Sequence, residues 1–164
     1  MKKHFCLTFF SICFIKIAVA QNNYCDDITR DTDAVKKTIT WRTPELNINI
    51  KAIITEKPEL WISFNLKRQS EFIAEEDGLF IRFDDGKSLK YFGQRVSRKY
   101  ISAHEGYYYQ TDMLLKPDDL LWLKTKKITK YQIAGIDVPV TNDLAVEIQA
   151  YIICITGNFE KKEN

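Results

Sequence analysis

The chain has 164 residues, of which 45% are hydrophobic and 28% are charged, and its formal net charge is +2 at pH 7. This length suits one domain that buries a core of its own. Lysine and arginine are scattered among aspartate and glutamate. A nucleic-acid-binding protein would instead present a clustered positive footprint, so the charge pattern argues against nucleic acid as a partner.

Residues 1–20 have the pattern of a secretory signal peptide. A basic start precedes an apolar run over 5–15, and Ala18-Val19-Ala20 forms a small-residue cleavage site. The apolar segment is interrupted by Lys16 and is shorter than the roughly 20 residues that a transmembrane helix needs. We therefore predict a cleaved leader and one β-rich domain over 21–164. We expect that domain to be secreted to the periplasm or cell surface, with no membrane span in the mature chain.

Removal of the leader changes the charge and the cysteine count. Three lysines and no acid are lost, which leaves 21 basic and 22 acidic side chains and a net charge of −1. The remaining cysteines, Cys25 and Cys154, lie near opposite ends of the chain. An oxidising compartment favours a disulfide between them, and two buried free thiols are the alternative. In the chain-entropy model, a loop of about 130 residues gives roughly 4–5 kcal/mol of stabilisation.

The first half of the chain is rich in segments where apolar and polar residues alternate. This period of two is typical of half-buried β-strands. Asp84-Asp85-Gly86 separates two such segments and predicts a hairpin turn. We predict strands over 28–32, 38–42, 46–54, 61–66, 72–75 and 79–83, with a returning strand that contains Leu89 and Tyr91.

The second half mixes strands with two helical segments. Residues 93–106 are polar and weakly periodic, which predicts a long loop before a strand over 107–114. Pro117 suits the first position of a short helix near 117–124, with acidic residues in its first turn. A strand over 127–133 follows and ends at Gly135.

The C-terminal segment near 142–156 is ambiguous, because its apolar residues fit both helical and strand spacing. Its length favours a helix, with Asn142 as N-cap and Gly157 as the stop. The complete pattern predicts a mainly β fold, an antiparallel β-sandwich or open barrel with a short helix near 117–124 and a C-terminal helix near 142–156.

The chain offers few groups for catalysis. His104 is the only histidine beyond the leader, and the second ligand of a zinc-protease helix would fall at position 108, which is Tyr108. Neither Cys25 nor Cys154 has the surroundings of a nucleophile. We therefore expect no catalytic residue, no metal site and no cofactor. Two acidic residues facing across a cleft would still suit sugar hydrolysis, but their approach depends on the fold.

Three consecutive tyrosines form the best binding candidate. On a strand, Tyr107 and Tyr109 share one face with Thr111, and Tyr108 points the other way. Aromatic rings with polar tips suit a carbohydrate or protein surface. Tyr107 and Tyr109 are therefore the predicted ligand-binding residues, and ordinary packing in a half-buried sheet is the alternative. The three tryptophans are too scattered in sequence to predict a platform.

Several segments resemble a broad group of small secreted Bacteroidetes proteins of unknown function. The resemblance covers most of the mature chain. It lies in the early cysteine with a charged Thr-rich segment over 25–40, the Gly-Leu-Phe-Ile-Arg-Phe hairpin over 78–83, and the motifs at 118–121 and 127–130. It implies a compact β-rich domain with a late cysteine, as Cys154 provides. It carries no activity, so no functional residue is transferred from it.

These observations favour an exported, non-enzymatic binding or structural module of the periplasm or cell surface, whose partner is a protein or a glycan. The alternative is a carbohydrate-binding or carbohydrate-cleaving domain that uses Tyr107, Tyr109 and paired acids.

Overall fold

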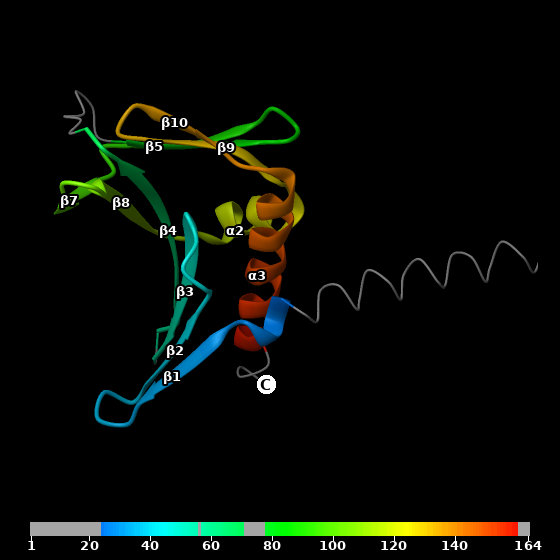
Figure 1. The fold of residues 1–164 in the computed structure, drawn as a ribbon. Helices are drawn as coiled ribbons and strands as arrows, with labels where there is room; N and C mark the ends of the chain where they lie inside the picture. Colours follow the sequence, from blue (N-terminus) through cyan, green and yellow to red (C-terminus); the bar gives the residue numbers. More distant parts are fainter. Residues whose placement is uncertain (1–23, 56, 71–77, 161–164) are drawn as a thin grey trace, which may run out of the picture.

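The computed structural model describes residues 24–55, 57–70 and 78–160, which form two antiparallel sheets with helices packed beside them (Figure 1). The predicted leader over 1–20 and the predicted short strand over 72–75 lie outside the described residues. The mainly β architecture is confirmed. Of the two forms predicted, the sandwich is the one observed, because the strands divide into two separate sheets.

The larger sheet has six strands, and one of its faces belongs to the core. Ile50 of one strand lies opposite Ile62 of the next, and both side chains are almost fully buried. The next residues along the two strands, such as Asn49 and Ser63, point to the opposite face of the sheet, which we call the outer face. In spatial order the strands are β1 (Thr29–Asp33), β2 (Thr38–Arg42), β3 (Ile48–Ile54), β4 (Glu59–Arg68), β8 (Gly106–Leu114) and β7 (Ser97–Ser102).

The smaller sheet is built from two hairpins. The predicted turn at Asp84-Asp85-Gly86 is confirmed, with Arg82 paired to Ser88 across it. Gly86 has a φ of 81°, a left-handed conformation that favours glycine. In spatial order the strands are β10 (Ile136–Pro139), β9 (Ile128–Ile133), β5 (Gly78–Phe83) and β6 (Ser88–Phe92).

Both predicted helices are present. α2 (Pro117–Thr125) begins with the predicted proline and acidic first turn. α3 (Asn142–Glu160) lies against β3 and α2 (Figure 1). Its start and end differ from the prediction. The Thr141 hydroxyl accepts a hydrogen bond from the Leu144 backbone N–H at 3.3 Å, and the helix continues through Gly157, which does not adopt a positive φ. No helix among the described residues has the length and apolar character required to cross a membrane.

The two sheets meet around a pair of aromatic rings. Phe64 of β4 and Tyr131 of β9 are both buried, and their ring centroids are 5.1 Å apart. The Tyr131 hydroxyl donates a hydrogen bond to the backbone carbonyl of Asn65. The β3–β4 register ends at Ile48 opposite Phe64, so this bond satisfies a carbonyl where the paired register has stopped. The contact fixes the smaller sheet against β4.

The predicted disulfide between Cys25 and Cys154 is confirmed, with the two Cα atoms 5.5 Å apart. It ties the segment before β1 to α3. Tyr24 packs edge-to-face on Tyr151 of the helix, with ring centroids 5.8 Å apart. The Tyr151 hydroxyl also donates to a carboxylate oxygen of Asp27 at 3.5 Å. The N-terminal part of the domain is therefore held to the C-terminal helix by covalent and non-covalent contacts.

Two strands were missed by the sequence prediction. The predicted loop over 93–106 is wrong, because residues 97–102 form β7 and pair with β8. The chain also turns at Ala134-Gly135 and returns as β10 instead of ending there. Both turn residues have positive φ, 52° and 77°, which is the conformation of a type I′ hairpin. Ala-Gly lacks the Asn or Asp that normally marks such a turn, so the hairpin had no clear local signal.

Candidate functional site

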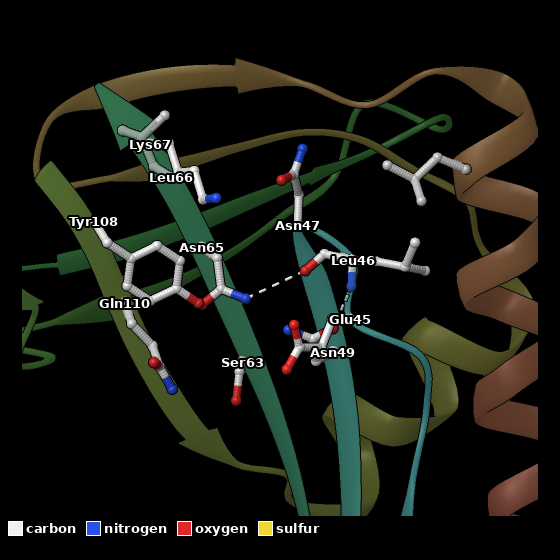
Figure 2. A pocket seen from close by; sticks show the side chains of 11 residues that line it. Glu45, Leu46, Asn47, Asn49, Ser63, Asn65, Leu66, Lys67, Tyr108 and Gln110 are labelled. Carbon is white, nitrogen blue, oxygen red and sulfur yellow. Dashed lines mark hydrogen bonds between the residues drawn. The ribbon is translucent and has the colours of Figure 1, made fainter. Parts of the chain in front are cut away.

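The outer face of the larger sheet carries a hollow that we call the Asn65 hollow. It has a volume of about 770 Å³ and lies where β3 begins beside the longer β4 (Figure 2). Leucines 46, 66 and 144 supply its apolar part. The polar side chains that line it are Glu45, Asn47, Asn49, Ser63, Asn65, Lys67, Tyr108 and Gln110. Most of these groups are neutral hydrogen-bonding side chains, which orient a polar ligand without requiring it to be charged.

Two smaller hollows adjoin the Asn65 hollow. The Lys99 hollow, of about 440 Å³, lies over β7 and β8 and shares Tyr108 and Gln110 with it. The Trp61 hollow, of about 360 Å³, lies over β3, β4 and β8 and shares Ser63 and Gln110 with it. Because Gln110 lines all three, the hollows are neighbours across the strands, and we call them together the outer trough.

Hydrogen bonds hold the middle of the outer trough in place. Asp112 accepts from the Ser63 hydroxyl at 2.5 Å and from the Gln110 side-chain amide at 2.7 Å. Its backbone carbonyl accepts from the Gln94 side chain at 2.9 Å. The register explains this arrangement, because Ser63 lies directly opposite Asp112 in the β4–β8 pair. Asp112, which its cross-strand partner Ser63 holds in place, therefore fixes the rotamer of its same-strand neighbour Gln110, the residue common to all three hollows.

Asn65 forms the buried floor of the Asn65 hollow, with only 4% of its surface exposed. Its side-chain amide donates to the backbone carbonyl of Leu46 at 3.3 Å, drawn as a dashed line in Figure 2. Its side-chain oxygen is buried and accepts no hydrogen bond from any described residue. A buried acceptor without a donor carries a desolvation cost of about 1–3 kcal/mol, which a donor group on a ligand would offset.

Tyr108 projects from β8 toward the Asn65 hollow (Figure 2), diagonally across from Asn65 in the strand register. Burial raises the pKa of its hydroxyl, and the charges of Glu45 and Asp112 raise it further. The hydroxyl is therefore protonated at neutral pH and is available as a hydrogen-bond donor. Tyr108 combines an aromatic face with a polar tip at the junction of two hollows.

The two tyrosines predicted from the sequence lie on the other face of the sheet. Tyr109 is buried in the core, with 2% of its surface exposed, so its ring is not displayed to solvent. Tyr107 is half-buried and packs edge-to-face on the exposed Tyr100, with ring centroids 5.3 Å apart. The predicted alternation along the strand is correct. It is Tyr108, on the face that the prediction did not choose, that lines the trough.

Trp61 also lines the outer trough. Its indole N–H donates to a carboxylate oxygen of Glu59 at 3.0 Å, which holds the half-buried ring over β4. His104, in contrast, is exposed in the turn between β7 and β8. Within the described parts of the chain, no three or more histidine, cysteine, aspartate or glutamate side chains are grouped in a way that suits a metal ion.

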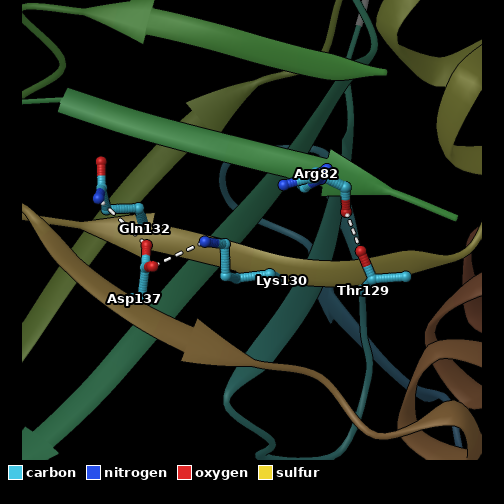
Figure 3. A network of polar contacts seen from close by, with 5 residues as sticks. All are labelled: Arg82, Thr129, Lys130, Gln132 and Asp137. Atoms are coloured by element: carbon cyan, nitrogen blue, oxygen red, sulfur yellow. Dashed lines mark hydrogen bonds and ion pairs between the residues drawn. The ribbon is translucent and has the colours of Figure 1, made fainter. Parts of the chain in front are cut away.

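The exposed face of the smaller sheet carries a second polar network (Figure 3). Asp137 accepts from the Lys130 ammonium at 2.7 Å and from the Gln132 amide at 3.1 Å. The Thr129 hydroxyl donates to the backbone carbonyl of Arg82 at 3.2 Å. A hollow of about 180 Å³ lies beside these groups. The contacts satisfy one another within the sheet and are those expected of a solvated surface.

No family model matches the chain, and no curated protein or solved structure is significantly similar to it. The geometry of the outer trough is therefore the basis for assigning a function.

Proposed function

We propose that this protein is an exported, non-enzymatic binding module and that its outer trough binds a glycan chain. The observation that carries the proposal is the composition of the Asn65 hollow, where amide side chains surround a tyrosine and a buried unsatisfied acceptor. Sugars present many hydroxyl groups, each both donor and acceptor, together with apolar ring faces. Amide groups and an aromatic ring match both features.

The shape of the outer trough favours a chain over a single sugar. The three hollows lie beside one another across the strands and share lining residues, and the series runs from Trp61 at one end to Lys99 at the other. A monosaccharide would occupy one hollow and leave the other two empty. We expect affinity to rise with the number of sugar units until the trough is spanned.

Export is supported by the leader-like pattern of residues 1–20 and by the Cys25–Cys154 disulfide. Disulfides of this kind persist in oxidising compartments outside the cytoplasm. The resemblance to small secreted Bacteroidetes proteins agrees with the same location.

The raised pKa of Tyr108 favours binding over cleavage as the function of the trough. A tyrosine that acts as a base needs a lowered pKa, whereas burial and the nearby Glu45 and Asp112 raise it here. These two acids also give the cleavage alternative its one specific support, because both act electrostatically on a tyrosine in the trough. A glycosidase would need one acid and one base on opposite sides of the bond. Product analysis of each bound glycan distinguishes the two functions.

The experiment is a screen of the purified, oxidised protein against polysaccharides and their oligosaccharides, read by retention and by a shift in melting temperature. Tyr108→Ala is expected to weaken binding about tenfold or more, since stacking and hydrogen bonding together are worth about 1.5 kcal/mol. Tyr100→Ala, on the opposite face, is the matched control and should bind normally. Absence of binding to every glycan would refute the proposal, and so would equal effects of the two variants.

A further inference from the structure

We propose that the glycan bound in the outer trough carries an anionic group, which Lys67 and Lys99 hold on either side of Tyr108. This inference rests on the proposed function and adds the charge of the ligand. The relevant residues come from three adjacent strands, β4, β8 and β7, so their positions are set by the sheet register.

The register places the two lysines symmetrically about the tyrosine. Lys67 lies directly opposite Tyr108 in the β4–β8 pair, and Lys99 lies directly opposite it in the β8–β7 pair. Neighbouring strands are about 4.8 Å apart, so the backbones of the two lysines are separated by roughly 10 Å. Both side chains are exposed, and their flexible four-carbon stems are free to swing toward the ring between them. A small anion above Tyr108 is therefore within reach of both ammonium groups.

Neither lysine is neutralised within the described parts of the chain. Lys67 and Lys99 form no ion pair with any described carboxylate. Two other lysines, by comparison, are paired, since Lys126 pairs with Asp85 at 2.8 Å and Lys130 pairs with Asp137 at 2.7 Å. The charges beside Tyr108 are thus available to a ligand.

The charge of the outer trough changes along its length. Among the residues that the structure describes, the Lys99 hollow is lined by Arg98 and Lys99 and by no carboxylate. At the opposite end, the Trp61 hollow is lined by Lys51 together with two acids, Glu59 and Asp112. Glu45 is the carboxylate in the Asn65 hollow between them. The electrostatic potential therefore favours an anionic group at the β7 end of the trough and disfavours one at the Trp61 end. This asymmetry also sets the direction in which the glycan chain lies.

A uronate carboxylate and a sulfate ester both supply this chemistry, and paired ligands separate them. Binding is measured by isothermal titration calorimetry with galacturonate oligosaccharides and their methyl esters, and with sulfated galactan oligosaccharides and their desulfated forms. Each pair has the same sugar backbone and length, so the two members differ only at the anionic group. A single-stranded DNA oligonucleotide of equal charge tests for general attraction of polyanions.

We expect at least one anionic oligosaccharide to bind about tenfold more tightly than its neutral counterpart, with an affinity that falls as salt rises. Lys67→Gln and Lys99→Gln should each weaken that binding about two- to fivefold, the range for exposed charge pairs, and should weaken binding of the neutral counterpart by a smaller factor. Lys90→Gln, an exposed lysine on β6 outside the trough, is the matched control and should have no effect.

Equal binding of charged and neutral forms would overturn this inference and leave the proposed function standing. Binding of neither form, nor of any other glycan, would overturn both. An equal loss with Lys90→Gln, or equal binding of the DNA, would show nonspecific attraction and would also overturn the inference. Unchanged melting temperatures of the variants verify that the fold is intact.

Discussion

Replacing Tyr131 with phenylalanine tests how the two sheets are joined. The substitution preserves the ring that packs on Phe64 and removes only the hydroxyl that donates to the Asn65 carbonyl. That carbonyl would then be left without its donor in a buried position. We expect the free energy of unfolding to fall by about 1–3 kcal/mol, the cost of one unsatisfied buried polar group. This is a large fraction of the roughly 5–15 kcal/mol typical of a domain.

The measurement is urea-induced unfolding at several pH values. Burial, and to a smaller extent the neighbouring Tyr108, raises the pKa of Tyr131 above the ordinary value of about 10. Because the folded state holds the neutral form, its contribution is fully present below pH 10 and is lost as the pH rises further. Tyr131→Phe has no proton to lose at this position. The stability difference between the two proteins should therefore narrow progressively as the pH rises above about 10.

Tyr100→Phe is the control, because Tyr100 is 56% exposed and its hydroxyl makes no hydrogen bond to a described residue. It should change the free energy of unfolding by less than about 0.5 kcal/mol at any pH. A similarly small change for Tyr131→Phe at neutral pH would refute the reasoning. A stability difference that widens above pH 10 would refute it as well.

Two further predictions concern the covalent link and a tight turn. Replacing Cys25 and Cys154 together with serine should lower the free energy of unfolding by about 4–5 kcal/mol, because the bridge spans 129 residues of sequence. The reduced wild type should match this variant in urea unfolding, and a loss below about 1 kcal/mol would contradict the estimate. Gly106→Ala should cost about 3 kcal/mol or more, since the added Cβ would lie 2.1 Å from the Arg68 carbonyl oxygen. Gly135→Ala is its control in thermal unfolding, because it shares a positive φ but has open space, and equal losses would contradict the steric explanation.

Some of the architecture follows from local sequence. Alternation over 48–54 and 78–83 places isoleucine and leucine side chains on one face, and both segments are strands with that face buried. Asp-Gly at 85–86 and Pro117 act through backbone conformation, so their effects are visible without knowledge of the partners.

The candidate site depended on information that the sequence does not carry locally. Alternation correctly separates Tyr108 from Tyr107 and Tyr109, but it leaves open which side faces the core. That choice is made when the smaller sheet and α3 cover one face of the larger sheet. Tyr107 and Tyr109, which were predicted to bind a ligand, lie on the covered face. Asn65 is a further example, because this polar residue is buried at the place where β3 begins beside β4, which its local sequence does not indicate.

Strand periodicity, the main hairpin and the start of α2 were predictable from the sequence, because each depends on neighbouring residues. Counting cysteines favoured the disulfide, and segment length favoured the C-terminal helix, but both left an alternative open. Packing of α3 on the apolar face of β3 and on α2 resolves the ambiguity of apolar spacing in that helix. Tertiary pairing also accounts for the edge strand β7. Its residues 97–100 are exposed on both faces and carry no alternation, so pairing with β8 is what makes them a strand.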